Sequence, residues 1–278
     1  MGVVLEGVGL THAGGAPALQ DIDLRIEAGE RVAIIGSSGA GKTTLLRLLA
    51  TGLMPSSGQL ALFDQAPAQL RPRALQRLRS RIGLIHQSPP IPPRQRVVTA
   101  VQAGRLGQWS LARALLSLCY PTDIEGVEQV LAPLDLTDKL FSRCDQLSGG
   151  QLQRVGIARV LYQRAELVLA DEPVAAMDPL LADHTVALLN RLAAERRVTL
   201  VASLHAVDLA LKHFPRVIGL RAGRLHFDCA AGQVSEAMLA SLYANQELGA
   251  VPAGPGMPIA GSTAHATGDR TGIAPRCL

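Results

Sequence analysis

The chain has 278 residues, 48% of them hydrophobic, which is enough apolar material for a packed core and predicts a globular protein. Its formal net charge of +4 is too small to indicate binding to nucleic acid or to anionic lipid. Aromatic residues make up only 3% of the chain, which leaves few side chains for stacking against single-stranded nucleic acid.

The sequence contains no segment expected to cross a membrane. Its longest apolar runs, such as residues 198–204, are far shorter than the roughly 18 residues that a spanning helix needs. The N-terminus also lacks the order of basic, apolar and small residues found in a signal peptide. We therefore expect a soluble, unexported chain that can still dock onto a membrane protein.

The cysteines are far apart in the sequence, at Cys119, Cys144, Cys229 and Cys277. They have neither the CxxC spacing of a zinc site nor the density of a disulfide scaffold. This pattern predicts reduced thiols.

Short β-like runs alternate with turn residues at the start of the chain. Residues 3–5, 22–26 and 31–35 form the runs, and Gly/Pro-rich turns at 14–17 and 28–30 separate them. This alternation predicts hairpins that lead into one buried strand.

A glycine-rich loop follows that strand. Residues 36–43 read Gly-Ser-Ser-Gly-Ala-Gly-Lys-Thr and precede an amphipathic run to residue 50, which is a complete P-loop between a strand and a helix. Its backbone N–H groups and the positive end of the helix would hold phosphates, Lys42 would reach the phosphate oxygens, and Thr43 would ligate Mg²⁺. The loop alone does not separate transporters from kinases, GTPases or helicases. The predicted nucleotide-binding residues here are Gly36, Ser37, Ser38, Gly39, Ala40, Gly41, Lys42, Thr43 and Thr44.

A mainly helical insertion is expected over residues 88–164. Proline-rich residues 88–93 interrupt the chain, and apolar residues then recur at helical spacing, as in residues 111–118. Within the insertion, Leu-Ser-Gly-Gly-Gln at residues 147–151 opens a further helix. Its hydroxyl and N–H groups form a second anion-binding surface. The residues of that surface are Ser148, Gly149, Gly150 and Gln151.

Strands and helices alternate again from residue 167, with runs at 167–170, 180–194, 198–203 and 207–213. This rhythm predicts a mostly parallel, helix-covered sheet. Two carboxylates follow the first of these strands at the sheet edge where α/β proteins place ligands. Asp171 is predicted to hold Mg²⁺ and Glu172 to act as general base. An Asp-Glu pair alone is more often a solvated turn, so the prediction depends on the P-loop.

Together, the P-loop and the sequence at residues 147–151 resemble the ATP-binding cassettes of the ABC class over residues 3–245. The resemblance implies an ATPase with ATP and Mg²⁺ as cofactors. In that family the 147–151 segment, called the signature, covers the ATP held by the P-loop of a second chain, so a head-to-tail homodimer is implied.

The implied fold is α/β, with a P-loop RecA-like core containing a mainly parallel sheet, an N-terminal antiparallel β-subdomain and a helical subdomain insertion. We expect the nucleotide-binding core at residues 1–87 and 165–250, the helical subdomain at 88–164, and a disordered tail at 251–278, where Gly, Pro, Ala, Ser and Thr predominate.

Further positions match the family one by one. Gln87 resembles the Q-loop glutamine that touches Mg²⁺ and water, which makes it a candidate catalytic residue and metal ligand. His205 resembles the switch histidine that contacts the γ-phosphate and orients Glu172. Asp178 resembles the D-loop aspartate at the dimer interface. The family usually stacks adenine on an early aromatic residue, and this sequence offers only His12 there, so His12 is the candidate adenine platform.

A finer resemblance is to the ATP-binding subunits of phosphonate and phosphite importers. It is carried by residues 104–107, Ser110, residues 113–118 and 204–210, and the Leu242-Tyr243 pair, although many importer ATPases could share such helix-packing features. It implies uptake of a phosphonate, phosphite or related phosphorus oxyanion.

The implied partners are integral membrane permease subunits and a periplasmic or lipid-anchored solute-binding protein, with no nucleic acid. The implied location is peripheral, at the cytoplasmic face of the cell membrane. We expect the permease to dock at residues 88–93 and at Arg94, Arg96 and Arg105. A soluble ABC ATPase of a phosphonate-degrading enzyme complex would carry the same nucleotide motifs, and it stays open as the alternative.

Overall fold

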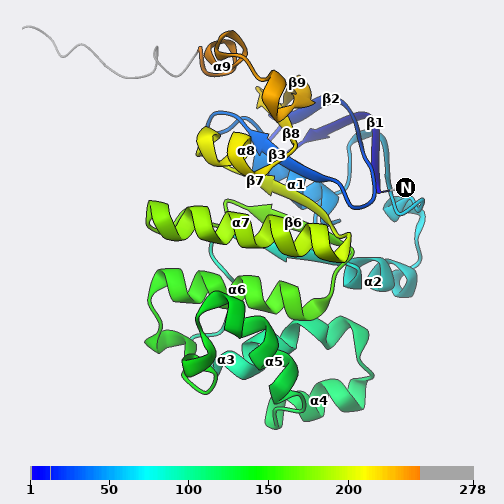
Figure 1. Cartoon of the computed structure of the whole chain (residues 1–278). Helices are drawn as coiled ribbons and strands as arrows, with labels where there is room; N and C mark the ends of the chain where they lie inside the picture. Colours follow the sequence, from blue (N-terminus) through cyan, green and yellow to red (C-terminus); the bar gives the residue numbers. More distant parts are fainter. Residues whose placement is uncertain (1, 13, 245–278) are drawn as a thin grey trace, which may run out of the picture. The chain divides into compact units, whose positions relative to one another are not determined.

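The computed structural model describes residues 2–12 and 14–244, and Figure 1 shows its elements. A small antiparallel sheet contains β1 (Val3–Thr11), β2 (Pro17–Ile26) and β4 (Ser57–Leu62) in the order β2-β1-β4. In β2, Ile22, Leu24 and Ile26 alternate with exposed residues, so their side chains share one face of the sheet and are buried.

The larger sheet has the strand order β5-β6-β7-β3-β8-β9. Its strands are β3 (Arg31–Ile35), β5 (Ile82–Ile85), β6 (Leu167–Asp171), β7 (Thr199–Ser203), β8 (Arg216–Arg221) and β9 (Arg224–Ala230). The first five in spatial order pair in parallel, and β9 pairs antiparallel with β8 at one edge. The inner strands are near-continuous apolar runs because both faces of a parallel sheet are covered.

Helices surround this sheet and form the insertion. α1 (Lys42–Leu49) follows β3, α2 (Pro72–Ser80) precedes β5, and α7 (Pro179–Arg196), α8 (Val207–His213) and α9 (Glu236–Tyr243) belong to the C-terminal half. Between β5 and β6 the chain is helical, with α3 (Val97–Gln102), α4 (Leu111–Cys119), α5 (Ile124–Leu131) and α6 (Gly149–Gln163). These four helices form the lower part of Figure 1.

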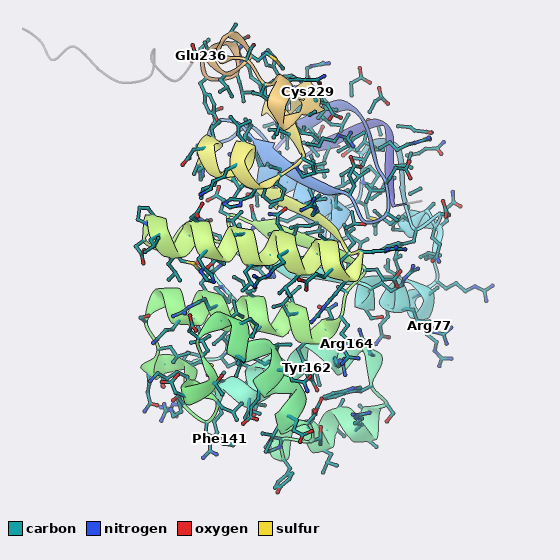
Figure 2. All side chains as sticks on the ribbon, viewed as in Figure 1. Arg77, Phe141, Tyr162, Arg164, Cys229 and Glu236 are labelled. Carbon is teal, nitrogen blue, oxygen red and sulfur yellow. The ribbon has the colours of Figure 1, made fainter. Side chains whose placement is uncertain are left out.

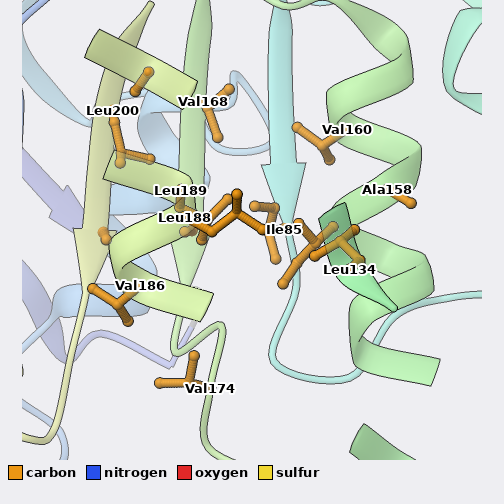
Figure 3. Packing of buried hydrophobic residues seen from close by; sticks show 14 of the residues in the cluster. Ile85, Leu134, Ala158, Val160, Val168, Val174, Val186, Leu188, Leu189 and Leu200 are labelled. Atoms are coloured by element: carbon orange, nitrogen blue, oxygen red, sulfur yellow. The ribbon is translucent and has the colours of Figure 1, made fainter. Parts of the chain in front are cut away.

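Two apolar cores lie on opposite faces of the large sheet. In β3, Val32 and Ile34 belong to the core shared with α1 and the small sheet, whereas Ala33 and Ile35 belong to the core shared with α6 and α7. Figure 3 shows part of the second core, with Val168 and Leu200 of the sheet near residues of α7. Burial of each leucine or valine stabilises the fold by about 1.5–3 kcal/mol.

The predicted fold is confirmed in its main parts: a mainly parallel sheet, an N-terminal antiparallel sheet and a helical segment between β5 and β6. The strand at Arg31–Ile35 and the helix at Val207–His213 lie where they were expected. The predicted tail at 251–278 lies outside the described residues. Among the residues that are described, no helix is long and apolar enough to span a membrane, and Cys144 and Cys229 are free thiols.

Candidate nucleotide-binding site

The P-loop backbone between β3 and α1 requires glycine. Gly36 has φ 152°, and a Cβ there would lie 2.1 Å from the Leu220 carbonyl oxygen. Gly41 has φ 104°, and a Cβ there would lie 2.8 Å from the Ala18 carbonyl oxygen. No side chain caps α1, whose N-terminal cap is Gly41. The first N–H groups of this helix are therefore left for an anion.

Lys42 places a cation inside the loop. Its Nζ donates to the carbonyl oxygens of Gly36 at 2.7 Å and Ser37 at 3.0 Å, and the residue is only 5% exposed. Burial lowers the pKa of the Lys42 ammonium, and the carboxylates of Glu172 and Asp171 oppose that shift. The loop thus holds a buried positive charge that a phosphate would complement.

Asp171 meets two hydroxyl groups at the carboxyl end of the sheet. Thr43 Oγ1 donates to Asp171 Oδ1 at 3.0 Å, and Ser203 Oγ donates to the same oxygen at 2.9 Å. The parallel register pairs Asp171 with Ser203, and α1 brings Thr43 to both. Mg²⁺ prefers such oxygen ligands and usually takes one or two protein carboxylates, with phosphate and water as the remaining ligands. The residues present fit this ion.

Glu172 is held in place by its backbone and by His205. Its φ of 48° lies in the left-handed region, and its N–H group lies 3.2 Å from the Ser203 carbonyl oxygen and 3.1 Å from Ser203 Oγ. His205 Nε2 lies 2.5 Å from Glu172 Oε1; the glutamate side chain is 12% exposed and the histidine side chain 55% exposed. A carboxylate oriented in this way can accept a proton from water.

The signature residues form the start of α6, where Ser148 is exposed and Gln151 is half-buried. Ser148 Oγ accepts from the Gln151 N–H at 3.2 Å, and Gln151 Oε1 accepts from the Ser148 N–H at 2.9 Å, which is a capping box. Gly149 is exposed beside them and Gly150 is half-buried. Among the described residues no hydrogen bond joins this group to the P-loop.

Three other predicted residues make no hydrogen bond or ion pair with Lys42, Asp171 or Glu172 among the described residues. Asp178 is the N-terminal cap of α7, where its Oδ1 accepts from the Leu181 N–H at 3.0 Å. Gln87 is exposed after β5. His12 is exposed at the end of β1, and its backbone N–H donates to the Ala16 carbonyl oxygen at 3.1 Å.

Comparison with known proteins decides the family. The ABC transporter family matches residues 19–175, which is more than half of the chain. The chain belongs to the ABC transporter family. The predicted cassette fold and ATPase class are thereby confirmed.

Related cassettes cover almost the whole chain. "Phosphonates import ATP-binding protein PhnC 1" of Pseudomonas aeruginosa is 67% identical over 255 residues, covering 92% of this chain and 96% of the relative. The protein named PhnC of Pseudomonas putida is 62% identical over 248 residues, covering 89% and 92%. Among solved structures, a dimer of the cassette MJ0796 in a post-hydrolysis state with ADP and Pi matches with TM-score 0.71 and 27% identity, covering 82% of this chain and 98% of that chain.

Two residues of this cassette belong to the site but were missed from the sequence. Ser203 is fully buried and contacts both Asp171 and the Glu172 backbone. Gln153 of α6 is 1% exposed, and its Nε2 donates to the His86 carbonyl oxygen at 2.9 Å, directly before Gln87. A polar residue ending an apolar strand was a usable signal for Ser203, whereas nothing local in the sequence marks Gln153.

Arg105, one of the predicted docking residues, makes contacts within the cassette. Its Nε donates to the Tyr162 carbonyl oxygen at 2.8 Å, and its guanidinium lies 4.6 Å from the centroid of the Tyr162 ring. These contacts fix Arg105 to α6 within the cassette, because an aromatic face and a carbonyl oxygen both attract a guanidinium. Arg94 and Arg96 are exposed.

Proposed function

We propose that this chain is the ATP-hydrolysing subunit of an importer for a phosphonate, phosphite or related phosphorus oxyanion. The hydrolytic role is carried by one observation, the Glu172 carboxylate 2.5 Å from His205 and at the same sheet edge as Asp171. The substrate class is supported by relatives of 62–67% identity that are named phosphonates import proteins.

The P-loop would hold the phosphates of ATP through its N–H groups between Gly36 and Thr44 and through Lys42. Thr43 and Asp171 would ligate Mg²⁺, with Gln87 as a further oxygen ligand once the segment after β5 approaches the site. The bound ion would offset the negative charge of the phosphate oxygens. His12 is the candidate surface for adenine, since no aromatic residue precedes the P-loop.

Glu172 polarises the attacking water in this proposal, and His205 positions its carboxylate. The left-handed backbone at Glu172 and the short contact to His205 hold the carboxylate before any substrate arrives. Such preorganisation lowers the cost of reaching the transition state.

A second copy of the chain completes each site. Ser148 and Gly149 are exposed at the start of α6, so the signature would be free to cover the nucleotide of the partner, with Asp178 at the interface. A related cassette of 27% identity forms a dimer in a solved structure with ADP and Pi, which supports the dimer. Closure of the dimer would move the helical segment at residues 88–164 relative to the core at residues 1–87 and 165–250.

The other proposed partners are permease subunits in the membrane and, acting through them, a periplasmic or lipid-anchored solute-binding protein. Nucleic acid is not among the proposed partners. The chain would act peripherally at the cytoplasmic face, with Arg94 and Arg96 in the surface that meets the permease.

The test uses the Glu172→Gln variant, which retains the shape of the side chain but cannot accept a proton. It should bind ATP normally and lose at least about 100-fold in turnover, because general-base catalysis contributes about that much. Tagged and expressed in native cells, the ATP-bound variant should co-purify with a polytopic permease. The ATPase of the wild-type complex should then rise when a phosphonate and the binding protein are added.

Two results would contradict this function. Undiminished turnover of Glu172→Gln would remove Glu172 from the base role. Recovery of soluble phosphonate-degrading enzymes without any permease would overturn the importer and favour an ATPase of an enzyme complex.

A further inference from the structure

A cavity of about 780 Å³ lies near the amino ends of strands in the large sheet, whereas the P-loop lies at the carboxyl end of β3. Its walls include Val168, Thr199 and Leu200, which lie at the amino ends of β6 and β7. Asp171 and Ser203, which belong to the nucleotide site, end the same two strands. The cavity is therefore separate from the nucleotide site, and its volume lies within the range of small-molecule sites.

About half of the residues that line the cavity are aliphatic. Val130 of α5, Val160 of α6, and Leu189 and Leu192 of α7 line it. Figure 3 shows Val160 on α6 and Leu189 on α7, on either side of Ile85. The helical segment and the core thus each supply part of the apolar lining.

Three arginines at the cavity have no side-chain partner in the part of the chain that the structure describes. Arg164, Arg196 and Arg197 line it and are exposed, and within residues 2–12 and 14–244 no hydrogen bond or ion pair is found for their side chains. Figure 2 shows Arg164 near Tyr162, at the C-terminal end of α6.

The other charged groups in the lining are engaged. Arg81 is paired with Glu166 through two bonds of 2.6 and 2.8 Å, and Tyr162 Oη donates to Asp123 Oδ2 at 2.8 Å. Asp64 also lines the cavity and has an interaction of its own. The positive charge that is left for a ligand is that of the three arginines.

The C-terminal ends of α6 and α7 both border the cavity. The two helices begin at predicted nucleotide-contacting residues. α6 starts after Ser148 and ends before Arg164, while α7 starts after Asp178 and ends before Arg197. The 15 residues of α6 span about 22 Å and the 18 residues of α7 about 27 Å. Figure 1 shows the two helices side by side. A ligand that contacts both ends would fix the helical segment against the core.

We propose that this cavity binds an amphipathic organic anion and that the bound anion slows ATP turnover. The aliphatic walls take the apolar body, and Arg164, Arg196 and Arg197 take a carboxylate, sulfonate or phosphate head, since guanidinium groups match such oxyanions. Turnover falls because closure of the dimer requires α6 and α7 to move relative to each other. The proposal does not depend on which solute is transported.

The backbone conformation allows two of the three positive charges to be removed without strain. Arg164 and Arg197 both follow a helix in the left-handed conformation, with φ 56° and 53°, which glycine adopts without strain. The double variant Arg164→Gly/Arg197→Gly should therefore fold normally. Arg164→Lys/Arg197→Lys keeps the charge, and Arg191→Ala removes an exposed arginine of α7 that does not line the cavity.

The experiment measures binding of dodecanoate to the full chain by calorimetry below its micelle concentration, with dodecyltrimethylammonium as the cationic control. Dodecanoate should bind saturably at one site and slow turnover, and the glycine double variant should bind at least about tenfold more weakly. The lysine variant and Arg191→Ala should bind as the wild type does. Equal binding of the cation, unchanged binding in the glycine variant, or unchanged turnover with dodecanoate bound would overturn the proposal.

Discussion

Two helices of this cassette begin with groups suited to a phosphate, and they are built in different ways. The P-loop that leads into α1 contains backbone conformations available only to glycine, and its Lys42 is buried against the loop's own carbonyl oxygens. The signature at the start of α6 is exposed and holds its own cap through Ser148 and Gln151.

The P-loop and the signature differ in which contacts hold them in place. The P-loop is fixed by contacts with the core of its own chain, such as the approach of Gly36 to Leu220. Among the described residues, the signature is held by the cap hydrogen bonds between Ser148 and Gln151, which agrees with the proposal that a second chain supplies its nucleotide. Substitutions in the P-loop should therefore change nucleotide binding by a single chain, whereas substitutions in the signature should change ATP turnover only through the assembled dimer.

Matched alanine substitutions at Gly36 and Gly149 should show the largest difference between the P-loop and the signature. Gly36→Ala places a methyl group 2.1 Å from the Leu220 carbonyl oxygen, so the free energy of unfolding should fall by at least about 2 kcal/mol and ATP binding should be lost. Gly149→Ala meets nothing within 4 Å, so its unfolding and its ATP binding as a monomer should be unchanged while turnover falls. Chemical denaturation and nucleotide titration measure both. Equal destabilisation by the two variants would contradict the comparison.

Removal of the P-loop cation should have the next largest effect. Lys42→Ala should weaken ATP binding about 10- to 100-fold, because it removes a charge-assisted contact to phosphate. Arg94→Ala, which removes an exposed cation outside the site, is the control and should bind as the wild type does. Normal ATP retention in Lys42→Ala, measured by equilibrium titration, would be incompatible with this role for the loop.

Loss of the Ser148 cap of α6 should have a smaller effect than loss of Lys42. Ser148→Ala should lower the free energy of unfolding by about 1 kcal/mol and reduce turnover. Ser235→Ala, which removes the cap of α9, should cost a similar amount of stability without reducing turnover. Thermal unfolding and ATPase assays on both variants separate the two contributions. If the turnover of both fell alike, the cap would act only through stability.

The segment before the signature can be probed through Cys144. Burial and the neighbouring Asp145 raise the pKa of its thiol to about 11. The folded thiol therefore keeps its proton above 9.0, where the unfolded thiol loses it, so its contribution to stability falls as the pH rises from about 9 to about 11.

Peptide mass spectrometry after iodoacetamide treatment at pH 8 should show slow labelling of Cys144 and faster labelling of the partly exposed Cys229. Rapid labelling of Cys144 would mean that the segment before the signature opens readily.

The sequence predicts the nucleotide side of this cassette well because its chemistry is local. The P-loop, the carboxylates after β6 and the signature are each short runs in which spacing and turn chemistry determine the structure. The short strand β4 and the strand β8 were not predicted, and each pairs with a strand distant in the chain, β4 with β1 and β8 with β3. The helix α2 and the strand β9 were not predicted either.

Residues whose roles depend on tertiary contacts were harder to assign. Ser203 meets Asp171 only through the register of β6 and β7. Arg105 was predicted to face a permease, but its contact with Tyr162 of α6 engages it within the chain. Arg164, Arg196 and Arg197 line one cavity because α6 and α7 both end there, which the local sequence does not indicate.

A mixing experiment tests most directly whether one chain's P-loop is completed by the signature of another. Lys42→Ala and Ser148→Arg each disable one of the two surfaces, so each homodimer should be inactive. In a mixed dimer both defects fall in the same composite site and leave the other site intact. Mixing the two purified variants should therefore restore part of the ATPase activity. A mixture as inactive as its separate components would contradict the account.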